Sequence, residues 1–277
     1  VSWSTPNYCY QGTKMETAQL VLNTKWGRPI TGKRVINSQD FLKRQATELQ
    51  YVFDKESPMF YVQAAVATSL IDKVKARTEG GKFYSCSCPD GFSGIVLAGE
   101  VKQYIHSDTP FTIDGTSPTS TGIAYLRNDE FSKKIANKMF EDSTKRPMHK
   151  ELGGLPYCPL ISLMTVDFLL TARDLPGWPG SFPEINKLDM LKKAVDELTA
   201  NKYDEQNIVR EINLLYDLSD FLGLSEEFRD ILKTAKLKTW ESFEGSGMSP
   251  KNLYIDGNEH RINNIFDACY FTYYSHS

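Results

Sequence analysis

Apolar residues recur every three or four positions through most of the last third of the chain. This spacing places side chains on one face of an α-helix, so it predicts helices over 188–199, 208–222 and 225–237. Gly223 would end the second of these helices and Ser225 would cap the third. Because two or three residues join the second helix to the third, we expect this pair to pack as antiparallel neighbours.

Other segments show weaker helical patterns. Ser57-Pro58 is a suitable helix start, because proline at the first helical position loses no hydrogen bond, and Gly80-Gly81 is a suitable stop. The tail at 260–274 has both helical spacing and strand-forming residues, and we favour helix. Residues 1–35 have no clear period and are predicted to be loop with one helix near 14–22. Further helices are predicted over 38–54, 58–79, 128–141 and 159–172.

Residues 82–126 have a different pattern, in which short apolar runs alternate with turn residues. Such runs are typical of strands and hairpins. In FYSCSCPDGF at 83–92, the Pro89-Asp90-Gly91 turn would close a hairpin. The sequence therefore predicts an α+β fold, dominated by helix, with a small antiparallel sheet or hairpin region at about 82–126 and a mostly helical C-terminal part.

The charges are unevenly divided along the chain. Residues 1–150 contain 20 Lys and Arg against 15 Asp and Glu, whereas residues 151–277 contain 12 against 20. We therefore predict a mixed α+β part over 1–150 with a basic balance and a mainly helical part over 151–277 with an acidic balance, or else one continuous domain. Such asymmetry would attract the basic part of one copy to the acidic part of the next, although scattered surface charge is the simpler interpretation.

Two simple counts bear on the environment of the chain. The longest apolar runs, such as GIVLAG at 94–99, are far shorter than the roughly 20 residues that cross a bilayer, so no membrane span is predicted. The five cysteines are odd in number and widely spaced, which does not fit a disulfide framework. Reduced thiols in an intracellular environment are therefore the favoured expectation.

Cys86 and Cys88 form the one close pair of cysteines. On a strand they would share a face about 6–7 Å apart, which is too far for an unstrained disulfide. They could supply half of a zinc site, but the chain has no second close pair of ligands, so no metal and no cofactor are predicted. The main interpretation is that both side chains fill one face of the hairpin. The alternatives are a redox role and covalent attachment of a ligand or pigment.

Catalytic motifs are scarce. The nucleophile elbow and the two common phosphate-binding glycine motifs are absent. Asp256, Glu259 and His260 are the candidate catalytic residues of a hydrolase or transferase with an unfamiliar site. The two carboxylates are three residues apart, which is not the spacing of a shared metal site. An Asp-Gly turn in a loop is the simpler explanation of this segment.

A basic cluster follows in the middle of the chain. Clustered lysines and arginines at helical spacing can contact phosphates, which makes nucleic acid a weak candidate partner. Acidic neighbours and a sequence pI of 5.9 favour a solvated helix surface instead. The cluster consists of Lys133, Lys134, Lys138, Lys145, Arg146, His149 and Lys150, of which the first five are the candidate contacts to nucleic acid.

Aromatic residues gather near both ends of the chain and in a proline-rich loop. Tyrosine and tryptophan are enriched in subunit interfaces because they combine apolar area with a polar edge. The grouped aromatic residues, the absence of catalytic motifs and the uneven charge together predict a non-catalytic structural or assembly subunit that self-associates, such as a coat, filament or scaffold component. The alternatives are an enzyme with an unrecognised site and a carrier that uses cysteine thiols. The aromatic residues are Tyr8, Tyr10, Trp178, Tyr270, Tyr273 and Tyr274.

Overall fold

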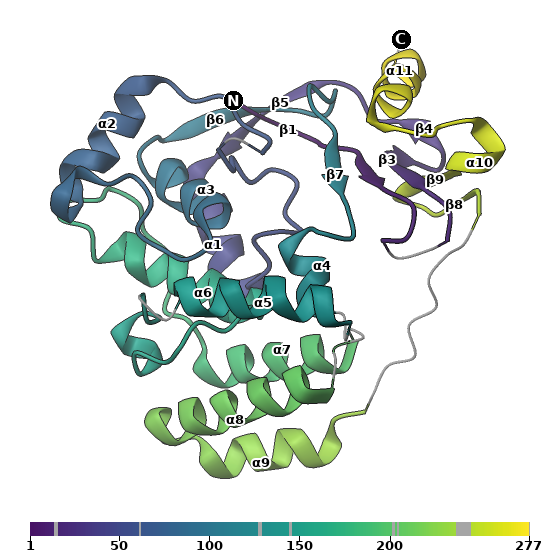
Figure 1. The fold of residues 1–277 in the computed structure, drawn as a ribbon. Helices are drawn as coiled ribbons and strands as arrows, with labels where there is room; N and C mark the ends of the chain where they lie inside the picture. The colour runs from purple at the N-terminus through teal and green to yellow at the C-terminus, as the bar shows by residue number, and fades with distance from the viewer. Residues whose placement is uncertain are drawn as a thin grey trace.

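The chain folds into a helical body with a mixed β-sheet at one side, as seen in a computed structural model (Figure 1). About half of the residues are helical, and the α+β class predicted from the sequence is confirmed. The structure describes residues 1–13, 16–60, 62–126, 129–143, 146–200, 203, 205–236 and 245–276.

The larger sheet joins the two ends of the chain. Strands β3 and β9 pair antiparallel from Gln19 opposite Asp256 to Asn23 opposite Asn252. The strand order is β7-β2-β3-β9-β8, and β4 pairs with the far end of β3. The strands are β2 (Asn7–Cys9), β3 (Gln19–Lys25), β4 (Arg28–Pro29), β7 (Asp114–Thr116), β8 (Gly247–Met248) and β9 (Asn252–Asp256).

One face of this sheet carries a small core of its own. Leu20, Leu22 and Ile255 are buried there with Tyr8. The short helix α10 (Gly257–His260) follows β9, and the C-terminal helix α11 (Ile265–Ser275) packs on this core through Ala268 and Phe271. Figure 1 shows α11 in yellow beside the sheet. The tail is therefore a helix, as expected from its spacing.

A second sheet of three strands has the order β1-β6-β5, in which β1 (Ser2–Trp3) runs parallel to β6 (Gln103–Ser107) and β5 (Lys33–Asn37) runs antiparallel to it. The strands that form within 82–126 are thus β6 and β7. Each pairs with strands from the N-terminal 37 residues, and they do not pair with each other. Strands are present in this region, but they contribute edges to two sheets.

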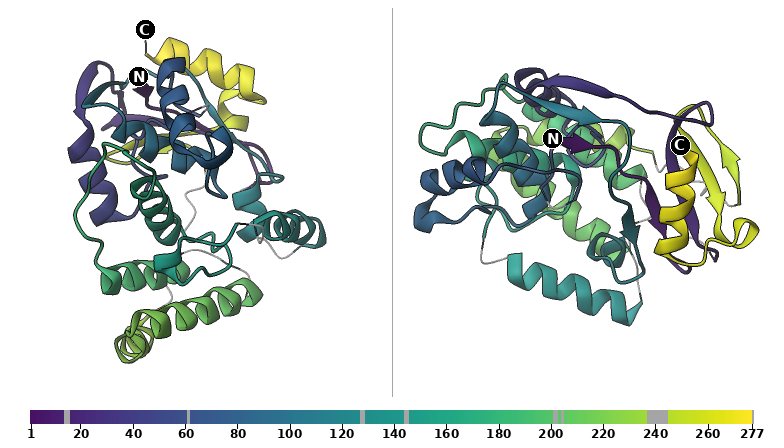
Figure 2. Two further views of the ribbon diagram at one scale, coloured as in Figure 1. Left: turned by 90° about the vertical axis from the view of Figure 1, so that its left-hand side faces the viewer. Right: turned by 90° about the horizontal axis from the view of Figure 1, so that it is seen from above.

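Helices make up the body. α7, α8 and α9 pack on one another in a layer at the bottom of Figure 1, and Figure 2 shows the same layer from the side. These three helices confirm the periodic pattern of the last third. The helices of the body are α1 (Ser38–Glu48), α2 (Thr68–Arg77), α3 (Pro89–Gly99), α4 (Thr121–Leu126), α5 (Glu130–Ser143), α6 (Ile161–Arg173), α7 (Lys187–Ala200), α8 (Glu205–Leu222) and α9 (Ser225–Thr234), with 3-10 turns at Glu79–Gly81 and Lys150–Leu152.

Helix α3 lies inside the main core, and every residue from Gly91 to Gly99 is buried. It packs against α1, α2 and α6. Its glycines let large rings come close: a Cβ added at Gly99 would lie 2.1 Å from the Trp178 ring, and one at Gly91 would lie 2.4 Å from the Phe168 ring. The Trp178 Nε1 donates to the carbonyl of Val96 at 3.0 Å, which fixes the ring against α3.

The prediction that a hairpin closes at 89–91 is wrong, because this segment begins α3. Pro89 occupies the first helical turn, where its missing N–H costs nothing, and Asp90 lies in the same turn. The following residues are apolar on every side because the helix is buried all round, so they show no helical period. Cys86 and Cys88 precede the helix in irregular structure and do not share the face of a strand.

Two other local predictions are also wrong. The helix expected from 58 starts at Thr68, because the preceding segment pairs with β1: Trp3 N–H donates to the Gln63 carbonyl and Ala65 N–H to that of Val1. In place of the helix expected near 14–22, the structure has irregular chain at 16–18 followed by β3 from Gln19. In both places long-range pairing outweighs local preference.

The predicted division near residue 150 stays a prediction, although β3 and β9 place both predicted parts in one sheet. No disulfide joins the five cysteines, all of which lie in the described residues. Within the described ranges, none of the helices combines the length and apolar character needed to cross a membrane.

The close packing of α3 makes a stability test possible. We expect Gly99→Ala to lower the free energy of unfolding by about 1–3 kcal/mol, because the added methyl overlaps the Trp178 ring. The matched control is Gly122→Ala in α4, where a Cβ meets nothing within 4 Å, so stability should stay equal or rise by up to about 1 kcal/mol. Urea unfolding measures both. Equal stabilities for the two variants would contradict the packing described here.

Candidate functional site

The outer face of α11 exposes four large aromatic side chains. Phe266, Tyr270, Tyr273 and Tyr274 are 73%, 67%, 70% and 71% exposed. Their spacing of four, three and one puts them on one side of the helix, and we call this set the aromatic stripe. Asn264 starts the helix by accepting hydrogen bonds from the N–H groups of residues 266 and 267.

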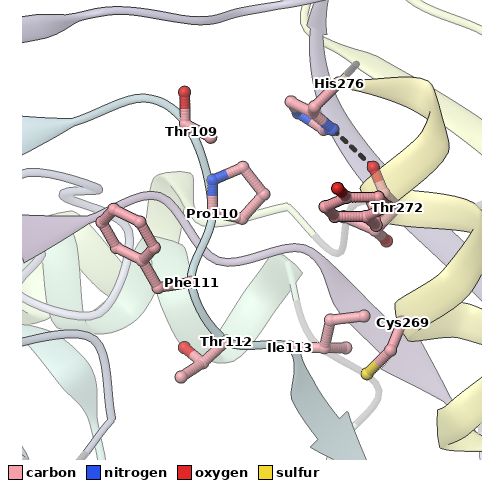
Figure 3. Close-up of a pocket in the computed structure, with 9 residues that line it drawn as sticks. Thr109, Pro110, Phe111, Thr112, Ile113, Cys269, Thr272 and His276 are labelled. Carbon is pink, nitrogen blue, oxygen red and sulfur yellow. Dashed lines mark hydrogen bonds between the residues drawn. The ribbon is translucent and has the colours of Figure 1, made fainter.

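A groove lies between α11 and the segment 109–113 (Figure 3). Its volume is about 350 Å³, and Phe111 stands 62% exposed at its edge. The buried Thr272 hydroxyl has no hydrogen-bond partner among the described residues, while His276 Nδ1 donates to the Thr272 carbonyl at 2.9 Å. The lining residues are Thr109, Pro110, Phe111, Thr112, Ile113, Cys269, Thr272, Tyr273 and His276. The groove extends the apolar surface beyond the aromatic stripe.

A larger cavity of about 560 Å³ opens at the surface of the helical body and is lined by α3, α4, α5, α6 and α7 and by the segment 51–53. We call it the tyrosine cavity, because Tyr51, Tyr125, Tyr157 and Tyr203 line it with Phe53. The remaining lining residues are mostly apolar: Val52, Ser87, Cys88, Pro89, Asp90, Thr121, Gly122, Leu126, Met139, Pro159, Ile161, Met164 and Glu197. It has the size and apolar character of ligand-binding pockets.

Two carboxylates lie in the wall of the tyrosine cavity, each at the start of a helix. Asp90 Oδ1 accepts hydrogen bonds from the Cys88 thiol at 2.7 Å and from the Gly91 N–H at 2.9 Å, at the start of α3. Glu197 reaches from α7 to the start of α6 and accepts from the Ile161 N–H at 2.8 Å. Burial raises the pKa of Glu197 above its usual range. Both acids therefore face the positive ends of helix dipoles.

The cavity wall is fixed from behind by a fully buried carboxylate, Glu211 of α8. The Tyr125 hydroxyl donates to Glu211 Oε1 at 2.6 Å, and the Cys158 thiol donates to Oε2 at 2.7 Å. Arg210 forms an ion pair with the same carboxylate, and its guanidinium lies 4.0 Å from the centre of the Phe140 ring. Burial, followed by the Glu211 charge, raises the pKa of Tyr125, so its hydroxyl stays protonated.

The structure separates the two predicted thiol sites. Cys86 is buried in the main core, and burial raises the pKa of its thiol well above the usual range. Cys88 lies in the wall of the tyrosine cavity, with its sulfur 3.4 Å from the Tyr51 hydroxyl. Burial and the Asp90 carboxylate raise the pKa of Cys88 to about 12. Both residues therefore hold neutral thiols near pH 7, which are poor nucleophiles.

Asp256, Glu259 and His260 lie at the turn from β9 into α10, outside the linings of the groove and the tyrosine cavity. Asp256 caps α10 by accepting from the N–H groups of Asn258 and Glu259 at 2.8 and 3.1 Å. Thr17 donates to the same carboxylate at 2.6 Å. The ring of His260 packs edge-on against Phe271. The observed contacts of Asp256 and His260 are structural, and their catalytic role stays a prediction.

The predicted basic cluster is only partly described. Lys133, Lys134 and Lys138 lie on α5, and Lys134 pairs with Glu130 one turn earlier at 3.2 Å. Arg146 donates to the carbonyl of Tyr84 at 3.3 Å. Lys145 lies outside the described residues. Nucleic-acid binding by this cluster stays a prediction.

A buried histidine that no sequence motif marked lies on β6, opposite Ser2 of β1. His106 is fully buried, with Nδ1 3.0 Å from the Ser2 hydroxyl and Nε2 3.3 Å from the Ser4 hydroxyl. Asp108 lies 3.7 Å from Nε2. These residue types match a hydrolytic triad, but Ser2 is fully buried as well, so a substrate cannot reach it. Burial lowers the pKa of His106, which favours the neutral ring.

No group of three or more candidate metal ligands comes together among the described residues. Among the described residues, the tyrosine cavity offers space for a small molecule and the aromatic stripe offers a surface for another protein. The sequence marked the tyrosines of the stripe and Cys88, but it did not mark the cavity. Its lining comes from seven separated stretches of the chain, so no local pattern could reveal it.

The raised pKa of the half-buried Cys88 thiol has a measurable consequence. At pH 8 a thiol with a pKa of about 12 is ionised in roughly one molecule in ten thousand. We expect iodoacetamide to alkylate the exposed Cys269 first and Cys88 far more slowly, as measured by peptide mass spectrometry over time. Asp90→Asn should speed alkylation of Cys88, because it removes a charge that raises the thiol pKa. Equal rates at Cys88 and Cys269 in the original protein would contradict this description.

The cap formed by Asp256 gives a second test. We expect Asp256→Ala to lower the free energy of unfolding by about 1 kcal/mol at pH 7 and Asp256→Asn to cost less, because asparagine is also a good cap. The Thr17 hydrogen bond lowers the pKa of Asp256, so its stabilisation is present above the unfolded value near 3.9 and is lost as the pH falls below it. Urea unfolding measures the difference in free energy of unfolding between the original protein and Asp256→Ala. We expect this difference to be smaller at pH 3 than at pH 7. A difference that is larger at pH 3 than at pH 7 would contradict the role of Asp256 as the cap of α10.

The chain was compared with protein-family models, with curated proteins and with solved structures, and none of them matches it. The side chains and cavities described above therefore carry the functional conclusions on their own.

Proposed function

We propose that this protein is a non-catalytic assembly subunit that self-associates, with a second copy of the chain bound through the aromatic stripe of α11. The observation that carries the proposal is the exposure of four aromatic side chains on one helix face. Exposed apolar patches of this kind mark interaction sites, because a monomeric protein gains nothing by leaving them in water.

The area of the stripe supports an interface. Aromatic side chains bury about 150–250 Å² each. At about 70% exposure, the four rings together present roughly 500 Å². A standard interface buries about 800 Å² on each partner. The groove and Phe111 lie beside the stripe and extend the same surface, so the contact has room to reach that size.

The chemistry of α11 favours a second copy as the partner. Asp267 in the first turn is the charged side chain of the helix, and His276 lies just past its end. Interface centres are depleted in charge and enriched in aromatic residues. Two copies of α11 in an antiparallel arrangement would form a twofold contact, in which the same residues serve on both sides. This arrangement runs the two helix dipoles antiparallel, which is their favourable relative orientation.

Self-association is tested by light scattering during size-exclusion chromatography over a range of protein and salt concentrations. We expect a concentration-dependent dimer or larger assembly that persists at high salt, because the contact is mainly apolar. The double variant Tyr270→Ser/Tyr273→Ser should weaken association at least tenfold. These positions are exposed, so the fold should be retained, as checked by circular dichroism.

The matched control is Phe131→Ser on α5, which removes an aromatic side chain of similar exposure (59%) from a different surface. It should leave association unchanged. A protein that stays strictly monomeric at high concentration and low salt would overturn the proposal. So would equal loss of association in the control and in the double variant.

A further inference from the structure

We propose that the tyrosine cavity binds a small organic cation: an ammonium group on an apolar or aromatic stem. The inference does not depend on self-association, because α11 contributes no residue to the cavity. Its volume of about 560 Å³ falls within the range of small-molecule sites, and such sites combine an apolar lining with a few polar groups that orient the ligand.

The aromatic lining suits a cation. Tyr51, Tyr125, Tyr157 and Tyr203 line the cavity, and Phe53, which is 67% exposed, lines its edge. The face of an aromatic ring is electron-rich and attracts an ammonium group within about 6 Å, and the attraction is stronger where water is excluded. Burial raises the pKa of the Tyr51, Tyr125 and Tyr157 hydroxyls, so their rings remain neutral phenols.

The charge of the cavity wall also favours a cation. Asp90 Oδ1 is occupied by the Cys88 thiol and the Gly91 N–H, and no further hydrogen bond to this carboxylate occurs among the described residues. The start of α3 contributes about half a positive charge, which one full carboxylate exceeds. The described residues that line the cavity include no lysine, arginine or histidine. An ammonium group beside Asp90 would therefore gain an ion pair, whereas an anion would meet repulsion.

The apolar part of the wall sets the shape of the stem. Leu126, Met139, Ile161 and Met164 lie among the rings, and a thioether side chain adapts to ligands of different outline. The bound molecule would be held by contacts and charge alone. A covalent bond to Cys88 is disfavoured, because its thiol is protonated at neutral pH.

Three probes of similar size test the charge preference: 2-phenylethylammonium, 2-phenylethanol and 3-phenylpropanoate. Each is titrated into the full chain at pH 7, with binding followed by calorimetry and by ligand-observed NMR. We expect saturable binding of the cation at least tenfold tighter than that of the alcohol, and the anion should bind weakest. A cation that binds no tighter than the alcohol, or that shows no saturable binding up to 10 mM (about −3 kcal/mol), would overturn the proposal.

Two variants locate the binding site. Asp90→Asn should reduce the preference for the cation over the alcohol to less than about threefold, and the control Asp72→Asn, on an exposed face of α2, should leave it unchanged. Gly122→Leu should weaken binding of the cation and the alcohol alike. Gly122 is exposed where it lines the cavity, and a Cβ there meets nothing within 4 Å, so we expect the larger side chain to narrow the opening without disturbing the fold. Cation binding that survives both Asp90→Asn and Gly122→Leu unchanged would place the site elsewhere and overturn the inference.

Discussion

The burial of α3 among α1, α2 and α6 is the packing on which the helical body depends. The glycines of α3 let the rings of Tyr51, Phe168 and Trp178 lie directly on its backbone. The start of the same helix presents Cys88 and Asp90 to the tyrosine cavity. Because the helix cannot shift without a clash, the position of the Asp90 carboxylate is set by the core. A ligand would therefore meet a site that is already formed, at little cost in ordering.

The sequence predicted the helices that show one apolar face and missed the elements that lack such a pattern. The last-third helices bury one side only, so their spacing was visible. Helix α3 is buried all round and has no period, and Pro89-Asp90-Gly91 is as suitable for a helix start as for a turn. Strand β3 forms between β2 and β9, and the residues near β3 carry no information about β9, which lies more than two hundred residues later.

The same reasoning applies to the candidate sites. Tyr270, Tyr273 and Tyr274 are close in sequence, so their grouping was visible before their exposure was known. Trp178 has the same chemistry but fills the space beside α3, which only the fold reveals. Cys88 was selected from the sequence for its thiol chemistry. In the structure its thiol instead donates a hydrogen bond to Asp90, the carboxylate that would pair with a cation. The full cavity needed the three-dimensional structure.

The pairing of β3 with β9 has a consequence for how the chain reaches its final form. More than two hundred residues separate these strands, and β3 lies in the middle of its sheet. During synthesis β3 can pair with β2, which precedes it, but its other edge stays open until β9 has been made. Such late, non-local pairing folds slowly and exposes strand edges to other chains. The sheet that carries α11 thus forms only after β9 has been made, so the aromatic stripe takes its place late in folding.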